Sequence, residues 1–281
     1  MKLSPWLIRA VPVALTLAVG LGVTYQYRAN AAAESADLRL TSVSEQPWDA
    51  VGGFQTTGYS LVADNLGPSA PAQFTVTVTT DGAATIRIGE DTFSGTVCRG
   101  ATTCQRTFIA PPPDGSDQPV EVRVSAVPGT RVTMVAAAVG AFTDPRTRNN
   151  RVRRAIPSTA DLSLAAGNES GDINNGTVTM NYSLTTGNGG PAMLPGYTVT
   201  VTTAANATIR IGEDTFSGTI CRGVTTCSRV VQVQFAPNTE RPVEVRVTAA
   251  AGTRVTITVA QPAPYADPES ENNVVRDRLP R

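Results

Sequence analysis

The side chains that could carry out chemistry in this chain are carboxylates, arginines and cysteines, and they occur in two matching sets. The carboxylate pair Glu90-Asp91 recurs as Glu213-Asp214. Such pairs could help bind Ca²⁺, a cation that takes about six to eight oxygen ligands, or could act as the two carboxylates of a glycosidase. Adjacent residues on a strand point to opposite faces, which disfavours the glycosidase interpretation. We therefore expect polar turns between strands, with calcium binding as the alternative.

The matching sets arise because the sequence is a duplication. The 13-letter block from Ala84 to Thr96 recurs unchanged from Ala207 to Thr219, and Cys98 is matched by Cys221, 123 residues later. Solenoid repeats have periods of about 20 to 50 residues, so this period is that of a whole domain. A chain of 281 residues also fits a prior of about 150 residues per domain. The sequence therefore predicts two copies of one domain.

The four cysteines follow the duplication, since each copy carries its own Cys-x5-Cys segment. Four cysteines allow three pairings, and a copy that folds alone selects one of them. We predict the bonds Cys98–Cys104 and Cys221–Cys227. A redox dithiol is disfavoured because the segment lacks the two-residue spacing and the helix N-terminus that lower a thiol pKa. Each bond should pin a loop.

Arginine and aromatic residues in and beside the repeated block form a candidate binding patch, because both types are common anchors of protein interfaces. The patch consists of Arg87, Phe93 and Arg99 with their counterparts Arg210, Phe216 and Arg222. The competing interpretation is that the block is a duplication remnant or a shared core requirement, with Ile86, Ile88 and Phe93 buried around the disulfide.

The missing residue types exclude many enzymes. The chain has no histidine, and Lys2 is its only lysine. Histidine-assisted nucleophiles, imidazole zinc ligands and Schiff-base lysines are thereby excluded from the folded part. Formal charge is balanced, with 23 basic and 23 acidic residues, so no basic field favours nucleic acid. We expect no catalytic residues and no cofactor; a carboxylate-dependent hydrolase is the enzyme class that survives.

Alternating polar and apolar residues predict strands throughout the region after the N-terminus, as in the segments 75–79 and 120–124. Clusters of Gly, Pro, Asn and Asp separate the strands. In the first copy we expect strands near residues 37–44, 56–65, 72–80, 84–89, 95–109, 119–127, 130–140 and 149–156. Two facing antiparallel sheets bury the inward Val, Ile and Leu side chains. The predicted fold is all-β, with tandem immunoglobulin-like sandwiches at residues 36–156 and 160–281.

The first 33 residues read as an export segment. Lys2 and Arg9 precede an apolar run over residues 10–23, and small residues follow at 29–33, the order found in a secretory signal peptide. The run is shorter than the roughly 20 residues that span a bilayer. Aromatic residues at both ends, however, are typical of an anchored helix. Signal peptide and retained N-terminal membrane anchor both stay open, and both place the rest outside the cytoplasm.

The openings Ala36-Asp37-Leu38 and Ala160-Asp161-Leu162, the mid-domain cysteine pair and the closing Asp-Pro-x3-Asn-Asn motifs at 144–150 and 267–273 resemble bacterial surface Ig-like repeats. The similar families are domain-of-unknown-function eleven and the CARDB adhesion-type domains. The resemblance covers both copies. It implies secreted or envelope-attached modules, often in tandem and without known catalysis.

These observations predict a non-enzymatic extracytoplasmic protein that acts as an adhesion or recognition module at the cell envelope. We expect a protein partner, with a glycan less favoured because aromatic residues make up 5% of the chain. We expect no nucleic acid, and membrane contact through the N-terminal segment alone. A passive spacer tethered by its N-terminal helix is the alternative, and a secreted carboxylate-dependent hydrolase is the third hypothesis.

Overall fold

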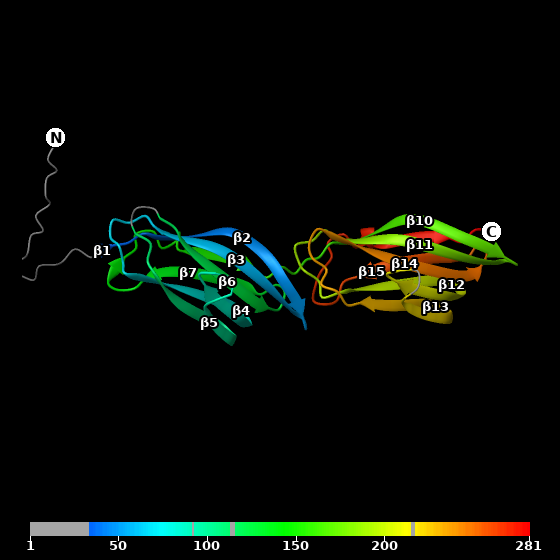
Figure 1. Cartoon of the computed structure of the whole chain (residues 1–281), viewed down its shortest axis with the longest axis horizontal. Helices are drawn as coiled ribbons and strands as arrows, with labels where there is room; N and C mark the ends of the chain where they lie inside the picture. Colours follow the sequence, from blue (N-terminus) through cyan, green and yellow to red (C-terminus); the bar gives the residue numbers. More distant parts are fainter. Residues whose placement is uncertain (1–33, 92, 113–115, 215–216) are drawn as a thin grey trace, which may run out of the picture. The chain divides into compact units, whose positions relative to one another are not determined.

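The computed structural model describes residues 34–91, 93–112, 116–214 and 217–281, and it is all-β within these ranges (Figure 1). We call residues 36–156 the first repeat and residues 160–281 the second repeat. The predicted N-terminal export segment, residues 1–33, lies outside the described residues. No helix in the described part of the chain is long and apolar enough to cross a membrane.

The first repeat is built on one seven-stranded antiparallel sheet, ordered β2-β3-β6-β4-β7-β9, with β5 also paired to β4. Its strands are β2 (Leu38–Val51), β3 (Phe54–Asn65), β4 (Gln73–Gly89), β5 (Thr96–Ile109), β6 (Gln118–Ala126), β7 (Arg131–Ala138) and β9 (Arg151–Ala155). Two short parallel strands, β1 (Glu34–Ser35) and β8 (Phe142–Thr143), pair separately. The predicted strands are thus found, with one difference in β4.

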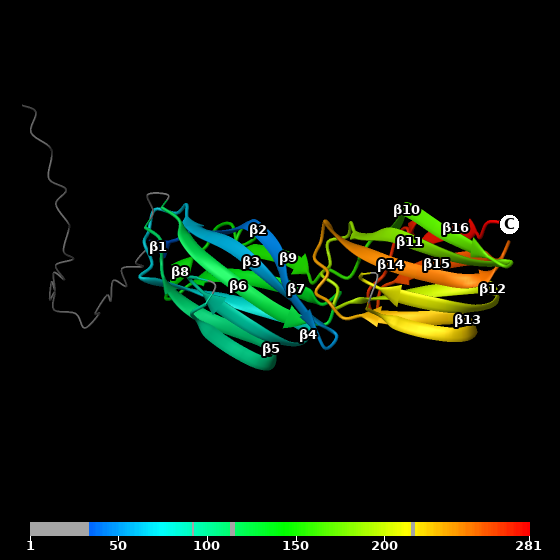
Figure 2. The ribbon, with the colours of Figure 1, turned by 45° about the vertical axis from the view of Figure 1, so that its right-hand side comes forward.

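The predicted break between residues 80 and 84 is a corner within β4 (Figure 2). The first half of β4 pairs with β7, whereas the second half, from Thr85 to Gly89, pairs with β6. β5 follows β4 around the corner, with a register shift between Thr79 and Ala84. A bulge of this kind bends a strand and increases its twist. The hairpin therefore joins two layers into one continuous sheet.

The second repeat has the same order, β10-β11-β14-β12-β15-β16, with β13 paired to β12. Its elements are β10 (Leu162–Asn174), β11 (Thr177–Asn188), β12 (Tyr197–Gly212), β13 (Thr219–Val231), β14 (Thr239–Ala250), β15 (Arg254–Ala260), the short 3-10 helix η1 (Ser270–Asn273) and β16 (Val274–Arg278). A register shift between Thr202 and Ala207 forms the corresponding corner.

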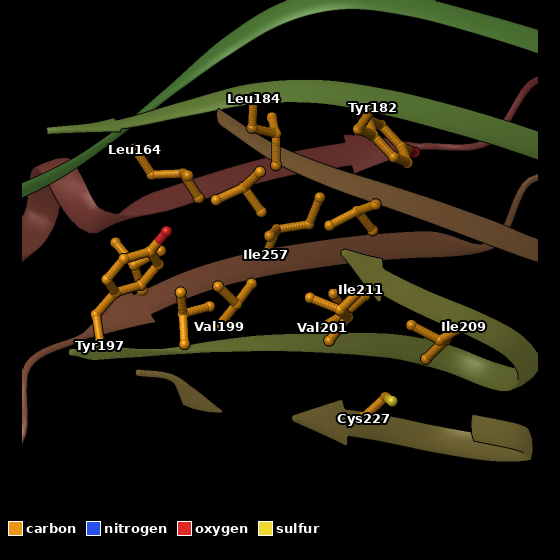
Figure 3. Packing of buried hydrophobic residues seen from close by; sticks show 14 of the residues in the cluster. Leu164, Tyr182, Leu184, Tyr197, Val199, Val201, Ile209, Ile211, Cys227 and Ile257 are labelled. Atoms are coloured by element: carbon orange, nitrogen blue, oxygen red, sulfur yellow. The ribbon is translucent and has the colours of Figure 1, made fainter. Parts of the chain in front are cut away.

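Each repeat buries its own apolar core between the layers. Inward residues alternate with outward ones, as the period of a strand requires. In the second repeat, Leu164, Tyr182 and Leu184 from β10 and β11 face Val199 and the other apolar side chains of β12 (Figure 3). The first repeat buries a separate cluster drawn from β2 to β9 and ending at Ile156. The cores explain why alternation alone located the strands.

Both disulfides lie at the corners. The structure joins Cys98 to Cys104 and Cys221 to Cys227, the pairing that the duplication predicts. An extended strand would separate such cysteines by about 20 Å, yet the Cα atoms of Cys98 and Cys104 are 5.8 Å apart. The two cysteines face Ile86 and Val78 on β4. Each bond therefore closes the bend at which the hairpin passes from one layer to the other.

The residues of the opening and closing motifs of each repeat form hydrogen bonds with one another. In the first repeat, the Asp144 carboxylate accepts hydrogen bonds from the Leu38 amide at 3.2 Å and from Asn150 Nδ2 at 2.8 Å. Asn149 Nδ2 donates to the Asp37 carboxylate at 2.8 Å. The second repeat repeats all three bonds through Asp267, Asn273, Asn272 and their partners Leu162 and Asp161. These residues therefore hold the first sheet strand against the end of its own repeat.

Strand β3 of the first repeat carries polar side chains into the core. Gln55 and Thr57 are fully buried, and neither polar atom of the Gln55 amide has a hydrogen-bond partner among the described residues. The corresponding positions in the second repeat hold Val178 and Met180, which belong to the core. An unsatisfied buried polar group destabilises a protein by about 1–3 kcal/mol. At this position the first repeat therefore buries an unsatisfied amide where the second repeat buries an apolar side chain.

Replacing Gln55 with valine is expected to stabilise the first repeat by about 1 kcal/mol, because two unsatisfied amide atoms leave the core. Chemical denaturation of the full chain measures the change in stability. Hydrogen exchange of the amides in β3 and β6 shows whether the change falls in the first repeat. Val178→Gln in the second repeat is the matched control and should destabilise that repeat. A lower stability of the Gln55→Val chain would show that the amide is satisfied by buried water.

Candidate functional site: the arginine face of each repeat

The outward face of each sheet carries a pair of opposed arginines. Arg87 on β4 lies directly opposite Arg123 on β6, and Arg210 on β12 lies directly opposite Arg246 on β14. Like charges that face each other across two strands destabilise a sheet. We call this surface the arginine face; it also includes Arg99 on β5 in the first repeat and Arg222 on β13 in the second. Packing of the core does not require these charges.

The loop after β4 holds one arginine of each pair. Arg87 Nη1 donates a hydrogen bond to the Phe93 carbonyl at 2.6 Å. In the second repeat, Arg210 Nε and Nη2 donate to the Ser217 carbonyl at 3.2 and 2.9 Å. The Phe93 and Ser217 carbonyls therefore lie against the arginine faces.

Phe93 corrects the sequence analysis, because its side chain is 80% exposed and not part of the core. Ile86 and Ile88 are buried as expected. The alternation along β4 ends at Gly89, so Phe93 belongs to the loop and no longer follows the strand period. Its counterpart Phe216 lies outside the described residues. An exposed phenylalanine beside Arg87 fits a contact surface better than a core requirement.

The predicted carboxylate pairs lie in the same loops and are held by protein groups. Asp91 Oδ1 accepts hydrogen bonds from the amides of Phe93 and Ser94 at 2.7 and 2.6 Å, and Oδ2 accepts from the Ser94 hydroxyl at 2.9 Å. The Ser94 amide, and then the Phe93 amide, lower the pKa of Asp91. Asp214 accepts the Ser217 amide at 2.5 Å. These aspartates organise the turns.

The glutamates of the pairs contact arginines. Glu90 Oε1 lies 3.6 Å from Arg106, and Glu213 Oε1 lies 3.3 Å from Arg229. Among the described residues, no group of three or more His, Cys, Asp and Glu side chains is arranged to hold a metal ion. The contacts of these carboxylates are those of polar turns between strands.

Sequence reasoning missed Arg123 and Arg246. Both arginines lie in segments whose alternation is that of an ordinary half-buried strand. The arginine opposite each of them comes from a strand distant in the sequence. Burial and then the charge of Arg87 lower the pKa of the Arg123 guanidinium, while Glu121 acts in the opposite direction. The recurring Val-Glu-Val-Arg-Val letters at 120–124 and 243–247 were the available signal.

The comparisons with known proteins leave the family open. No protein-family model matches the chain, and no curated protein matches it. The resemblance to domain-of-unknown-function eleven and CARDB domains therefore stays a prediction.

Several solved structures are similar at a low level. A partial N-terminal region of an enterococcal surface protein is 8% identical, covers 92% of this chain and 99% of its own, and has a TM-score of 0.29. The CupB6 tip adhesin from Pseudomonas aeruginosa is 7% identical, with coverages of 88% and 99% and a TM-score of 0.28. An anti-sigma factor domain-containing protein is 7% identical, with coverages of 86% and 98% and a TM-score of 0.33. Similarity this low carries no functional argument.

Proposed function

We propose that this chain is a non-enzymatic, extracytoplasmic pair of Ig-like β-sandwich domains, at residues 36–156 and 160–281, that binds a protein partner at the cell envelope. The arginine faces are the binding surfaces. The observation that supports this most strongly is the opposed arginine pair, Arg87 with Arg123 and Arg210 with Arg246. The pair opposes folding through repulsion, yet it is present in both repeats.

The surroundings of the pairs differ between the repeats, which shows that the copies have diverged around them. Gly58 lies beside Arg123 on β3, whereas Asn181 lies beside Arg246 on β11. Arginine is enriched among the residues that dominate binding energy at protein interfaces. Two binding faces on one chain would also strengthen attachment through effective concentration.

Chemistry and compartment support a binding role outside the cytoplasm. Disulfides form and persist in oxidising environments such as the periplasm and the cell exterior, and both cysteine pairs of this chain are bonded. The chain has no histidine, and the carboxylates of the repeated loops are engaged in turns and ion pairs. The N-terminal segment serves export as a signal peptide or as an anchor.

Loss of both loop-side arginines is expected to reduce partner capture at least tenfold, because Arg87→Ala and Arg210→Ala remove one charge from each face. The full chain, immobilised and exposed to envelope proteins of its source, would be compared with the double variant by quantitative mass spectrometry. Arg154→Ala, on a strand outside the arginine faces, is the control. Equal recovery of every protein by all three chains would reject the arginine faces and favour a passive spacer.

A further inference from the structure

The arginine face of the first repeat carries a tryptophan that the second repeat lacks. Trp48 is the extra residue of a β-bulge, where pairing between β2 and β3 skips from Pro47 to Asp49. Bulges re-aim side chains, and this one places the indole over Gly58. A Cβ atom at Gly58 would lie 2.6 Å from Trp48 Nε1, so only glycine leaves room for the ring.

The second repeat has no bulge at this point of the sheet, and a hydrogen bond to its arginine stands where the first repeat has Trp48 over Gly58. Strand β10 pairs with β11 without interruption from Glu169 to Asn174. Asn181 takes the place of Gly58, and its Oδ1 accepts a hydrogen bond from Arg246 Nε at 2.6 Å. The guanidinium of the second repeat therefore has a partner in its own sheet.

Arg123 in the first repeat has no such acceptor. Its guanidinium carbon lies 3.7 Å from the centroid of the Trp48 ring, a cation–π contact. Its Nη2 is buried and has no hydrogen-bond partner in the described part of the chain. A buried donor without an acceptor is costly, and more so when it is charged. Trp48 holds the Arg123 guanidinium through the cation–π contact but supplies no hydrogen-bond acceptor for Nη2.

The two acidic side chains that share a hollow with Arg123 and Trp48 accept hydrogen bonds from other groups. A shallow hollow on this face is lined by Trp48, Gly58, Arg87, Asp91, Glu121 and Arg123, among others. Glu121 Oε2 accepts a hydrogen bond from Ser60 at 3.1 Å, and Asp91 accepts those of its own loop. No ion pair in the described residues involves Arg87, Arg99 or Arg123. Arg87 and Arg123 therefore share this hollow, and neither has a carboxylate within ion-pair distance among the described residues.

Building on the proposed function, we propose that the arginine face of the first repeat, and not that of the second, binds an acidic segment of the partner protein. A Glu or Asp carboxylate of that segment lies over Arg87 and Arg123, which are both partly exposed, and accepts hydrogen bonds from their guanidinium groups. Charge-assisted hydrogen bonds of arginine to carboxylate are among the stronger ones in proteins. The exposed part of Trp48 packs against the neighbouring residues of the segment, and Arg99 contacts a further acidic side chain.

Tryptophan fluorescence tests this proposal, because the chain holds only two tryptophans, Trp6 and Trp48. In the full chain carrying Trp6→Phe, Trp48 is the sole fluorophore. The probe is an octaglutamate peptide, with an octaserine peptide as the neutral comparison. Saturable change of Trp48 emission with octaglutamate, absent with octaserine and weakened by salt, is the expected result.

Three variants separate the first face from the second. Arg123→Gln removes one guanidinium group of the opposed pair, and Gly58→Asn displaces the indole and gives Arg123 the acceptor found in the second repeat. Each should weaken octaglutamate binding at least tenfold, measured by anisotropy of a labelled peptide. Arg246→Gln is the matched control and should change affinity less than twofold.

Two results would overturn the proposal while leaving the proposed function standing: capture of an envelope protein by a chain that does not bind octaglutamate, or equal losses for Arg123→Gln and Arg246→Gln. Tighter binding of heparin than of octaglutamate would also overturn it, since the face would then prefer an anionic glycan. The proposed function itself fails in the separate capture experiment, through equal recovery by the arginine variants.

Discussion

Replacing Asp144 with alanine is expected to destabilise the first repeat by about 3 kcal/mol. The carboxylate accepts hydrogen bonds from the Leu38 amide, from Asn150 Nδ2 and, at 2.8 Å, from the Arg146 amide. Its removal leaves donors beside β2 without an acceptor, at about 1–3 kcal/mol for each buried one. For a domain of this size, the midpoint of thermal unfolding should fall by about 10 °C.

Hydrogen exchange shows where this destabilisation occurs. Amides of β2 to β9 should lose protection in the Asp144→Ala chain, while those of β10 to β16 keep theirs. Asp267→Ala makes the corresponding bonds of the second repeat impossible and should give the reverse pattern. Loss of protection across both repeats in either variant would contradict the division into domains at residues 36–156 and 160–281.

Replacing Cys98 and Cys104 together with serine is expected to destabilise the first repeat by about 2 kcal/mol. A disulfide acts mainly by restricting the unfolded chain, and a loop this short gives a modest effect. The bond also holds the corner of the hairpin, and Cys104 is buried against the core at 2% exposure. We therefore expect lower stability with the fold retained.

Unfolding in urea, with circular dichroism as the readout, measures this change. The variant with Cys221 and Cys227 replaced by serine is the matched control, and its loss should fall on the second repeat. Stability unchanged by either replacement would mean that the corners are fixed by the register shifts of β4 and β12 alone. A spectrum without strand signal would mean that the bonds are required for folding.

The strands could be predicted from the sequence because burial on one face of a sheet imposes a period of two. Phe74, Val76 and Val78 are buried in turn, and this pattern is local. The continuity of β4 is not local. Residues 80–83 interrupt the alternation and read as a break, whereas the hydrogen bonds to β5 continue around the corner.

The candidate site was predictable only in part, for the same reason. Arg87, Arg99 and Phe93 lie in or next to the repeated block and could be found by inspection. Arg123 meets Arg87 only because β6 pairs with the second half of β4. Trp48 joins them through a bulge in β2, and no periodic pattern marks a bulge. Contacts between segments far apart in the sequence bring the site residues together, and the spacing of residues along the chain does not reveal such contacts.

The central claim is that the outward arginine face of the first repeat binds a protein. The most direct test is a hydrogen-exchange footprint of the full chain in complex with the envelope protein that it captures. The account predicts protection in the facing segments of β4, β5 and β6, at residues 85–89, 96–99 and 121–125. Protection confined to the turns at the ends of the repeats, with these three segments unchanged, would contradict it.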